Sequence, residues 1–232
     1  MNAITLDDRL MSAAEYVRQD AILADIGTDH ALLPIFLLKS GRIKRAVLAD
    51  INEGPLDAAR LNAMAYGVTD DVSLHLTDGA QALDGLGITD YTVCGMGGEL
   101  IASIIEAAPH LCKEGVRLIL QPMTRPSALR IALARLGFRI LSETYTEAAG
   151  KHYVTMMAEY SGEAYELDLL GAELGYSEIK NPGAHLSYLK VRLKAFLKMK
   201  RGKELRGTPD SELVKLVSRA EAMISEYEGE LK

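Results

Sequence analysis

The chain has 232 residues, of which 48% are hydrophobic and 25% are charged, and its formal net charge is −6. This composition excludes a disordered, collagen-like or low-complexity polymer and predicts one folded domain with a small appendage. The 2 cysteines cannot form a disulfide scaffold, no histidine–cysteine cluster has zinc spacing, and no apolar run is long enough to span a membrane. Residues 1–10 also lack the order of a signal peptide, so we expect a cytoplasmic protein without a metal site.

Residues 1–160 alternate between short apolar runs and helical patterns. An amphipathic helix is predicted over residues 6–17. Strands are predicted at residues 21–25, 46–50, 72–76, 91–94 and 117–120. Helices are predicted at residues 31–39, 55–66, 99–110 and 127–136. Two further strands, at residues 138–146 and 152–160, flank the sequence AAGK at 148–151, which is typical of a β-hairpin turn.

These elements predict an α/β fold with an open, mostly parallel sheet of seven strands and helices on both faces. We interpret them as five strand-then-helix units followed by the hairpin, with continuously apolar strands like those of sheets that are buried on both faces. Such a Rossmann-like sheet binds its ligand at the carboxyl ends of the strands, where the direction of winding reverses. The unusual residues of this sequence directly follow the predicted strands, so the candidate site belongs at that edge.

The end of the chain predicts a second unit, an antiparallel helical hairpin of coiled-coil type. Apolar residues recur at steps of three and four in two stretches that begin at Pro182 and Pro209. They are Leu186, Leu189, Leu193 and Phe196 in the first stretch, and Leu213, Val217, Ala220, Ile224, Tyr227 and Leu231 in the second. We therefore expect one domain at residues 1–161 and a helical hairpin domain at residues 162–232.

The charges are distributed unevenly between these two units. Residues 1–160 have a net charge of −6, whereas residues 161–232 hold 12 basic and 12 acidic side chains. Within residues 190–206, eight basic side chains accompany Glu204 alone, which gives a local net charge of +7. Because each Lys or Arg that contacts a phosphate releases counterions, this segment is a candidate contact for a polyanion. A solvated helix face without a partner is the alternative interpretation.

The turn from Asp25 to His30, with the sequence DIGTDH, carries the first chemical signal. A glycine at this turn lets the backbone approach a ligand closely, and the next helix offers its N-terminal amides. A dinucleotide site would need the pattern GxGxxG to bind a pyrophosphate, but here a single glycine is followed by Asp29 and His30. Carboxylates at this position repel a pyrophosphate and favour a cationic ligand, which argues against NAD. A simple helix cap is the alternative role for Asp29.

Acidic residues also end the second and third predicted strands. Asp50 is placed to accept hydrogen bonds from both hydroxyls of an adenosine ribose, and Asp78 could accept one from the adenine amino group. Either acid alone is more typical of an ordinary turn. Together they predict a site for an adenosyl group without phosphates, and S-adenosylmethionine is such a ligand.

The fourth predicted strand ends in CGMGG at residues 94–98, whose three glycines open space for a planar base beside the sulfonium. The Asn/Asp-Pro-Pro-aromatic tetrapeptide of many amino-nitrogen methyltransferases is absent, which indicates a different nucleophile or one that needs no deprotonation. We interpret Cys94 as packing rather than as a nucleophile. The predicted cofactor site comprises Asp25, Gly27, Thr28, Asp50, Ile51, Asn52, Asp78, Gly79, Cys94, Gly95, Met96 and Gly97.

Taken together, several of these segments resemble one known family. DIGTDHA at residues 25–31, GMGG at 95–98, Gln121-Pro122, GFRI at 137–140 and Gly150-Lys151 are similar to the TrmK-type bacterial tRNA (adenine-N1)-methyltransferases, and the resemblance runs through almost the whole chain. It implies a class I methyltransferase domain with a C-terminal coiled-coil domain. It also implies methyl transfer from S-adenosylmethionine to N1 of adenosine 22 in tRNA.

Two positions depart from the family pattern. Leu32 stands where the family commonly has Tyr, and Met123 stands where it commonly has Asn. If an aromatic ring at the first position stacks on the target base, this protein must use His30 or another ring. Tyr145 and Tyr153 could substitute, although a core or surface role is the favoured interpretation of both.

N1 of adenine already presents an in-plane lone pair, so attack on a sulfonium methyl group needs alignment more than a general base. Asp29 is the candidate for stabilising positive charge on the product ring, and His30 for stacking on the base or hydrogen bonding to it. The predicted tRNA contacts are Lys190, Lys194, Lys198, Lys200 and Arg201, and neither a membrane nor an obligate protein partner is implied. A small-molecule methyltransferase and an RNA-binding protein with a non-catalytic cofactor site are the alternatives.

Overall fold

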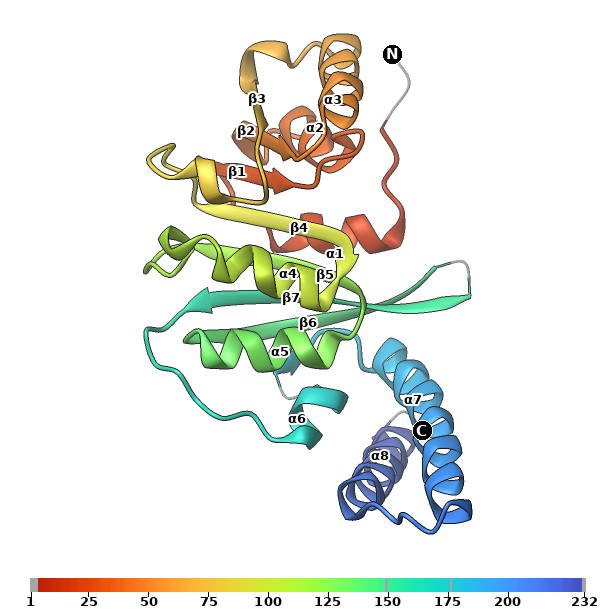
Figure 1. Ribbon diagram of the computed structural model, residues 1–232. Helices are drawn as coiled ribbons and strands as arrows, with labels where there is room; N and C mark the ends of the chain where they lie inside the picture. Colours follow the sequence, from red (N-terminus) through yellow and green to blue (C-terminus); the bar gives the residue numbers. More distant parts are fainter. Residues whose placement is uncertain (1–3, 149, 176, 231–232) are drawn as a thin grey trace.

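The computed structural model describes residues 4–148, 150–175 and 177–230. Within this part of the chain, eight strands form one sheet in the order β3-β2-β1-β4-β5-β7-β6-β8 (Figure 1). The strands are β1 (Ala21–Ile26), β2 (Ile43–Asp50), β3 (Val72–Leu76), β4 (Asp90–Gly97), β5 (Arg117–Thr124), β6 (Phe138–Ala148), β7 (Lys151–Tyr160) and β8 (Glu178–Ile179). Strands β1 to β5 are parallel to their neighbours among themselves, whereas β7 is antiparallel to both β5 and β6.

Helices cover both faces of this sheet because its strands are apolar on both sides. Helices α1 (Asp8–Tyr16), α2 (Leu32–Lys39) and α3 (Glu53–Tyr66) enclose one core, and α4 (Gly98–Glu106) and α5 (Pro126–Arg135) enclose the other. Successive side chains of a strand point to opposite faces, so β1 contributes Leu23 to the first core and Ala24 to the second. None of the described helices is both long and apolar enough to cross a membrane.

The order of the strands places a reversal of winding between β1 and β4. The chain runs outward from β1 through β2 to β3, then returns and adds β4 on the other side of β1. In an open α/β sheet, the crevice for a ligand lies outside the carboxyl ends of the strands at such a reversal. The pairing register sets Asp25 of β1 beside Thr92 of β4 at this point.

The α/β fold with a mostly parallel sheet is confirmed, but three details of the prediction are wrong. The sheet has eight strands rather than seven, because β8 pairs with β6 in parallel. Strand β3 is followed only by a 3-10 turn (Gln81–Leu83) and not by an α-helix. Helix α4 ends at Glu106, and residues 109–111 form a separate 3-10 turn, because Pro109 lacks an amide donor and disfavours helical geometry in the residue before it.

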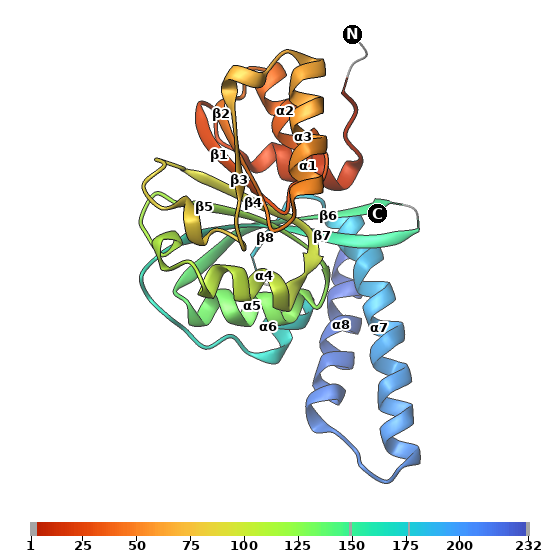
Figure 2. The same ribbon diagram turned by 45° about the horizontal axis from the view of Figure 1, so that its top comes forward.

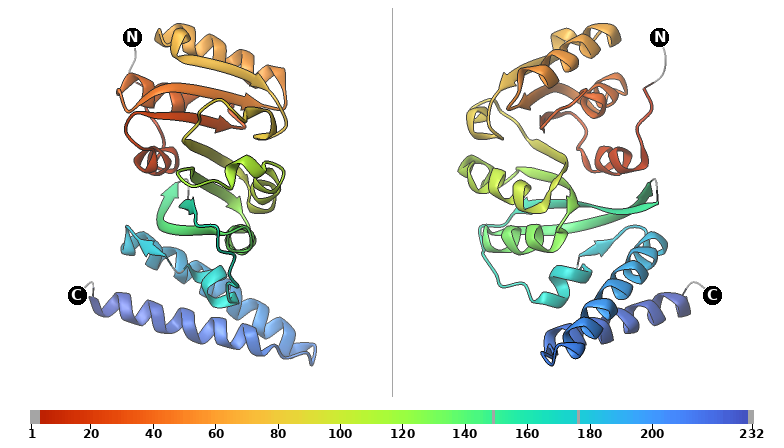
Figure 3. Two further views of the ribbon diagram at one scale, coloured as in Figure 1. Left: turned by 90° about the vertical axis from the view of Figure 1, so that its left-hand side faces the viewer. Right: turned by 45° about the vertical axis from the view of Figure 1, so that its right-hand side comes forward.

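Helices α7 (Pro182–Leu205) and α8 (Ser211–Glu230) form the predicted antiparallel hairpin, which projects from the sheet as a rod (Figure 2). Figure 3 shows the two helices side by side along this rod. The buried side chains between them follow the predicted spacing: Leu189, Phe196, Leu213, Val217 and Ala220. Ala149 of the predicted hairpin turn and Leu231 of the second predicted helix lie outside the described residues.

The segment that links the sheet to the helical hairpin was not predicted. It contains α6 (Leu169–Leu174), which contacts α5, and β8, which extends the sheet. Neither element carries a strong pattern, because one has six residues and the other has two. Part of the segment after residue 161 therefore packs on the sheet, and the division at residues 161 and 162 stays a prediction.

A buried ion pair joins the sheet to this linking segment. Arg130 of α5 and Glu143 of β6 are both fully buried, and the Nε of Arg130 donates to the Oε1 of Glu143 at 2.6 Å. Arg130 also donates to the carbonyl of Ala172 in α6 at 2.6 Å and to the hydroxyl of Tyr145 at 3.1 Å. These bonds satisfy the buried guanidinium, which would otherwise be costly in an apolar interior.

Rings of α7 pack on Tyr145, whose hydroxyl is bonded to Arg130 of this ion pair. The Tyr145 ring lies 4.3 Å from the His185 ring and 4.9 Å from the Tyr188 ring, measured between ring centroids. His185 is held in turn by the carbonyl of Leu174 at 2.9 Å and by the hydroxyl of Tyr227 at 2.9 Å. The first turns of the helical hairpin are thereby fixed against β6 and α6.

We predict that Glu143→Gln lowers the free energy of unfolding by about 3–5 kcal/mol, because it leaves the Arg130 charge buried without its partner. The control is Glu106→Gln, which breaks the exposed pair that Glu106 forms with Arg135 and should cost less than about 1 kcal/mol. Urea unfolding followed by circular dichroism measures both. Equal losses for the two variants would contradict the role of the buried pair.

Candidate functional site

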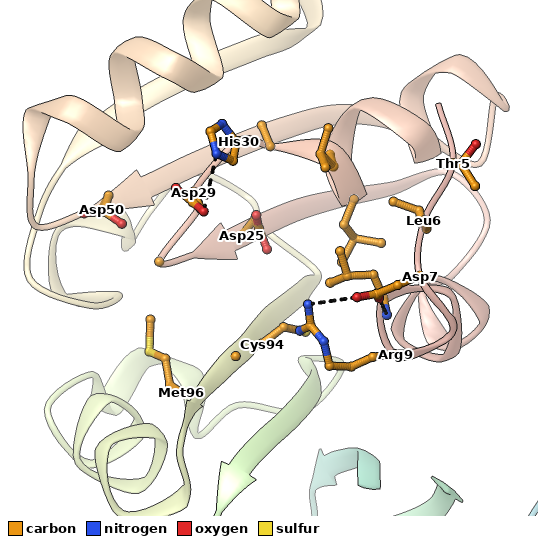
Figure 4. Close-up of a pocket in the computed structure, with 16 residues that line it drawn as sticks. Thr5, Leu6, Asp7, Arg9, Asp25, Asp29, His30, Asp50, Cys94 and Met96 are labelled. Carbon is orange, nitrogen blue, oxygen red and sulfur yellow. Dashed lines mark hydrogen bonds and ion pairs between the residues drawn. The ribbon is translucent and has the colours of Figure 1, made fainter. Parts of the chain in front are cut away.

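A cavity of about 650 Å³ lies at the carboxyl ends of β1 and β4 and is closed on one side by the start of α1 (Figure 4). This is the crevice expected where the winding of the sheet reverses. Eight of the predicted site residues line it: Asp25, Gly27, Asp29, His30, Asp50, Cys94, Gly95 and Met96. The structure therefore brings the ends of three strands together around one cavity.

Six other predicted cofactor residues are not among those that line the cavity: Thr28, Ile51, Asn52, Asp78, Gly79 and Gly97. Thr28 is buried beneath the first turn, whereas Asp78 is exposed. The amide of Thr77 donates to the carbonyl of Asp50 at 2.9 Å, so the loop after β3 lies against the end of β2 and near the cavity mouth. The cofactor roles of these six residues stay predictions.

Asp25 is the most deeply placed acid of the site, with only 9% of its surface exposed. The hydroxyl of Thr92 donates to its Oδ1 at 2.7 Å, as the register of β1 and β4 requires. Burial raises the pKa of the Asp25 carboxyl to about 6, because the charged form loses its hydration, and the bond from Thr92 opposes this shift. A cation in the cavity would stabilise the charged form of this carboxylate.

The first turn presents Asp29 and His30 at the rim of the cavity. Gly27 has a φ of +72°, which favours glycine, and a Cβ there would lie 1.9 Å from the Cε of Met96. Ala31 also has a left-handed φ, of +53°, and is the N-cap of α2 without a side-chain cap bond. Asp29 is therefore not the cap of this helix.

The side chains of Asp29 and His30 are exposed and lie close to each other. The Nε2 of His30 is 3.6 Å from the Oδ2 of Asp29, and both side chains are more than half exposed. The backbone carbonyl of His30 accepts a hydrogen bond from Asn62 of α3 at 2.9 Å, which ties this turn to the helix after β2. The hydrogen bond from Asn62 therefore anchors the backbone of this turn, while the side chains of Asp29 and His30 stay accessible to a ligand.

Asp50 is oriented by its own turn. Its Oδ1 accepts the amide of Asn52 at 2.8 Å, and among the described residues no bond to its Oδ2 occurs. One carboxylate oxygen is thus available to a ligand at the end of β2. This arrangement suits a pair of ribose hydroxyls, which is the role predicted for the residue.

The end of β4 forms the opposite wall of the cavity. Burial raises the pKa of the Cys94 thiol, so its reactive thiolate is disfavoured and packing is the better interpretation. Gly95 has a φ of +83°, and its amide donates to the Oε1 of Gln121 at 3.1 Å. A Cβ on Gly98 would lie 2.3 Å from the carbonyl of Arg125, so α4 can begin here only with a glycine.

Sequence reasoning missed the wall that comes from the N-terminal segment, which consists of Thr5, Leu6, Asp7, Arg9 and Leu10. The Nη1 of Arg9 donates to the Oε1 of Gln121 at 2.9 Å, across a separation of 112 residues. No motif marks Arg9, and its position on an amphipathic helix indicated only packing. The pairing with Gln121 became visible only in the folded chain.

The structure decides between the rings that were candidates for stacking on a base. Tyr145 is 1% exposed and packs under α7, so its candidacy is wrong. Tyr153 pairs with Thr146 near the tip of the β6–β7 hairpin and does not line the cavity. His30 is the only ring among the described residues that line it. Leu32 lines it as an aliphatic side chain.

The five residues that we predict to contact tRNA all lie on α7, but only two of them form ion pairs with acidic side chains of the described chain. Lys190 pairs with Glu228 at 2.7 Å, and Lys200 lies 4.0 Å from Glu204. In the part of the chain that the structure describes, Lys194, Lys198 and Arg201 are exposed and make no ion pair. Their spacing of four and three residues places these three cations on one face of the helix.

Comparison with known proteins connects this geometry to a family. Residues 6–156 match a family model described as a methyltransferase domain. A curated relative from Bacillus subtilis (strain 168), a tRNA (adenine(22)-N(1))-methyltransferase, is 33% identical over 159 residues, which are 68% of this chain and 67% of the relative.

Solved structures are similar over nearly the whole chain, including the helical hairpin. One is a Streptococcus pneumoniae protein assigned as a tRNA (m1A22) methyltransferase and crystallised with S-adenosyl-L-methionine. It is 30% identical, with a TM-score of 0.81, over 95% of this chain and 100% of that chain. The B. subtilis m1A22 tRNA methyltransferase TrmK is 24% identical, with a TM-score of 0.76, over 97% of this chain and 98% of that chain, and shares the fold.

We predict that Asp25→Asn stabilises the protein at neutral pH. The pKa of Asp25 is raised to about 6 in the folded state, so the folded protein binds this proton more tightly than the unfolded chain does. The stability that this proton provides is therefore lost as the pH rises through about 6 and the carboxyl ionises. The free energy of unfolding should rise by about 2–3 kcal/mol at pH 7 and by less at pH 4.5, where the wild-type carboxyl is mostly protonated. Urea unfolding at both pH values measures this.

The amide introduced by Asp25→Asn retains an oxygen that can accept the Thr92 hydrogen bond, so the variant changes the charge and little else. Asp57→Asn, on the exposed part of α3, is the matched control and should leave the free energy of unfolding nearly unchanged at either pH. A less stable Asp25→Asn protein at pH 7 would show that the buried carboxylate contributes to the fold.

Proposed function

Since the chain belongs to the methyltransferase-domain family that matches its residues 6–156, we propose that it transfers a methyl group from S-adenosylmethionine to N1 of adenosine 22 in tRNA. The observation that carries this proposal is the cavity at the ends of β1 and β4, lined by acids and glycines and lacking a pyrophosphate pattern. The relatives that carry this reaction in their names support it. We place its action in the cytoplasm, with tRNA as its macromolecular substrate.

The residues present fit this cofactor. A cavity of about 650 Å³ lies within the usual range for sites that bind molecules of this size. The available oxygen of Asp50 suits the ribose hydroxyls, and the buried carboxylate of Asp25 suits a neighbouring positive charge. Gly27 and Gly95 line the cavity with φ values of +72° and +83°, a backbone conformation that favours glycine, so the wall at these two points is backbone without a side chain.

When bound, S-adenosylmethionine supplies a methyl group on a positively charged sulfur. The chain has to hold the adenine ring so that its N1 lone pair points along the line of transfer, which needs no general base. We assign to Asp29, which lines the cavity, the role of stabilising the positive charge that the methylated ring acquires. The ring of His30 beside it is available to stack on the base or to donate to it.

The adenine must leave its stack or base pair to enter the cavity, since N1 is otherwise covered. Leu32 at the cavity offers an apolar surface but no ring, so His30 alone supplies an aromatic face among the described lining residues. We therefore assign recognition of the turned-out base to His30 rather than to a tyrosine.

The first 160 residues have a net charge of −6, so they repel RNA on average. We propose that the face of α7 with Lys194, Lys198 and Arg201 binds the tRNA backbone and sets its register. Contacts to phosphate position a nucleic acid without reading its bases. The packing of His185 and Tyr188 of α7 on Tyr145 of β6 supports this proposal, because it ties the helix to the domain that holds the cavity.

The function is tested by incubating the protein with an unmodified tRNA transcript and methyl-labelled S-adenosylmethionine, followed by mass spectrometry of the nucleosides. We expect 1-methyladenosine from a transcript with adenosine at position 22 and none from a transcript with guanosine there. His30→Ala should lower kcat about 10- to 100-fold and leave cofactor affinity within about threefold. His75→Ala, on β3 and outside the cavity, is the control.

Label in a small molecule but not in tRNA would favour the small-molecule methyltransferase. Binding of tRNA without any transfer of label would favour an RNA-binding protein with a non-catalytic cofactor site. Full activity of His30→Ala would end its assignment to the base.

We predict that reversing the charges of Lys194, Lys198 and Arg201 to Glu weakens tRNA binding at least tenfold and flattens its dependence on salt. Each lost phosphate contact removes close to one unit from the slope of log K against log salt concentration. The control is the reversal of Lys39, Lys44 and Lys113, which are exposed near the amino ends of the strands and change the net charge equally. A filter-binding titration at several salt concentrations measures both. If both triple variants weakened tRNA binding equally, net charge alone would explain the effect and the proposed contact on α7 would be contradicted.

A further inference from the structure

A surface with apolar, aromatic and basic side chains lies beside the cavity, where β5 ends and β7 begins. Met123 of β5 is 41% exposed, and Tyr153 of β7 is partly exposed. Lys151, the first residue of β7, is exposed and makes no ion pair in the part of the chain that the structure describes. None of the three is among the described residues that line the cavity, so the site described above leaves them without a role.

Contacts of α1 show on which face of the sheet this surface lies. One hydrogen bond joins α1 to the side chain of Gln121 in β5 at 2.9 Å, and another joins it to the hydroxyl of Thr155 in β7 at 2.7 Å. Side chains two residues apart on a strand point to the same face. Met123 and Tyr153 therefore share the face of Gln121 and Thr155, and the Met123 sulfur indeed lies 3.7 Å from the Nε2 of Gln121.

The pairing register brings Met123 and Tyr153 together. Strands β5 and β7 are antiparallel, and the final pair of their ladder sets Leu120 opposite Met156. Three residues further along each strand, the same register sets Met123 opposite Tyr153. Side chains at opposite positions of antiparallel strands have Cβ atoms about 5 Å apart. The register thus makes neighbours of a thioether and a phenol ring, which are favourable partners for each other and for a flat apolar ligand.

This surface begins directly past the wall of the cavity. Gly95, which lines the cavity, donates its amide to the Oε1 of Gln121 at 3.1 Å. Met96, which also lines it, pairs with Pro122. Met123 is the next residue of β5. A polymer with one unit inserted in the cavity would therefore meet Met123 and its neighbours with an adjacent unit.

The β6–β7 hairpin carries the surface towards the helix with the exposed cations. Figure 1 shows this hairpin extending past the ends of the parallel strands, on the side where α7 begins. The sheet order sets β5, β7 and β6 between β4 and α7, which packs on Tyr145 of β6. Lys151 lies two residues from Tyr153, or about 7 Å along the strand, and on the same face.

We propose that Met123 and Tyr153 bind the base of a nucleotide next to the target adenosine, and that Lys151 contacts its phosphate. This inference rests on the proposed function and adds to it a second RNA subsite between the cavity and α7. When the target adenosine turns out of its stack, the base beside it loses a stacking partner and has a face to offer. An aromatic ring replaces that partner, and a nearby lysine suits the backbone charge.

The test uses tRNA transcripts that lack one base, either before or after the target adenosine. The wild-type protein should bind one of these two abasic transcripts about 5- to 100-fold more weakly than the intact transcript, as expected for the loss of one stacked base. Exchanging that base for another should change the Kd less than about threefold, because stacking tolerates any base. Filter binding at constant salt measures each Kd. Equal binding of both abasic transcripts and the intact one would overturn the proposal.

Tyr153→Ala should weaken binding of the intact transcript by the same factor and should cost nothing further on the abasic transcript, since both changes remove one contact. Tyr153→Phe keeps the ring and should bind like the wild-type protein. Tyr66→Ala, at the end of α3, is the matched control and should leave the Kd unchanged. Additive losses for Tyr153→Ala and the missing base would show that ring and base do not touch, which would overturn the proposal.

The other two side chains are tested in the same assay. Met123→Ala should weaken binding about two- to tenfold, whereas Met64→Ala, exposed on α3, should not. Lys151→Gln should reduce the slope of log K against log salt concentration by close to one unit. Lys113→Gln, exposed before β5, is its control. Slopes that are equal in these two lysine variants would contradict the phosphate contact.

Two further measurements separate this subsite from the cavity. Tyr153→Ala should keep the Kd for S-adenosylmethionine within about twofold by calorimetry, which shows that the fold and the cofactor site are intact. It should raise the KM for tRNA and leave kcat within about threefold, because a base beside the target contributes to binding rather than to methyl transfer. A lower kcat at unchanged KM would assign Tyr153 to the target base and would overturn the proposal.

Failure of the subsite is distinct from failure of the proposed function. A protein that methylates tRNA and whose Tyr153→Ala variant binds tRNA like Tyr66→Ala would overturn the subsite alone. A wild-type protein that binds S-adenosylmethionine but neither binds nor methylates tRNA would overturn the proposed function, and the subsite with it.

Discussion

The carboxylate of Asp25 sits at the carboxyl end of β1 with little access to water, and the candidate site is built around it. It lies at the boundary with β4, where Thr92 supplies its hydrogen bond. Burial of a charge is costly unless an opposite charge is near, and the raised pKa of Asp25 expresses that cost. A cationic ligand would offset it, so ligand binding and the stability of the fold are linked at one residue.

A second buried charge organises the other end of the molecule. Arg130 and Glu143 are inaccessible to solvent, and Arg130 also donates to the hydroxyl of Tyr145, whose ring packs against that of His185. This cluster joins the sheet, α6 and the start of α7 into one packed unit. The first turns of the helical hairpin pack on this cluster through His185 and Tyr188, which joins the helix that carries the cations to the domain that carries the cavity.

The cavity and the helical hairpin carry different sets of charged side chains. The cavity gathers four carboxylates and one guanidinium, which suits a small zwitterionic cation with a ribose. Helix α7 carries Lys194, Lys198 and Arg201 exposed on one face, which suits a polyphosphate backbone. This separation avoids a conflict, since a cluster of basic residues inside the cavity would repel a sulfonium.

Local patterns in the sequence determined much of the fold and half of the site. Apolar strands followed by acids and glycines predicted the parallel sheet and the acids at its edge, because side-chain period and turn chemistry are encoded locally. Tertiary structure alone decided that Tyr145 is buried, that Glu178 and Ile179 join the sheet, and that Arg9 enters the cavity. Arg9 meets Gln121 across 112 residues, and no local pattern records a contact that only the packing of α1 against the sheet creates.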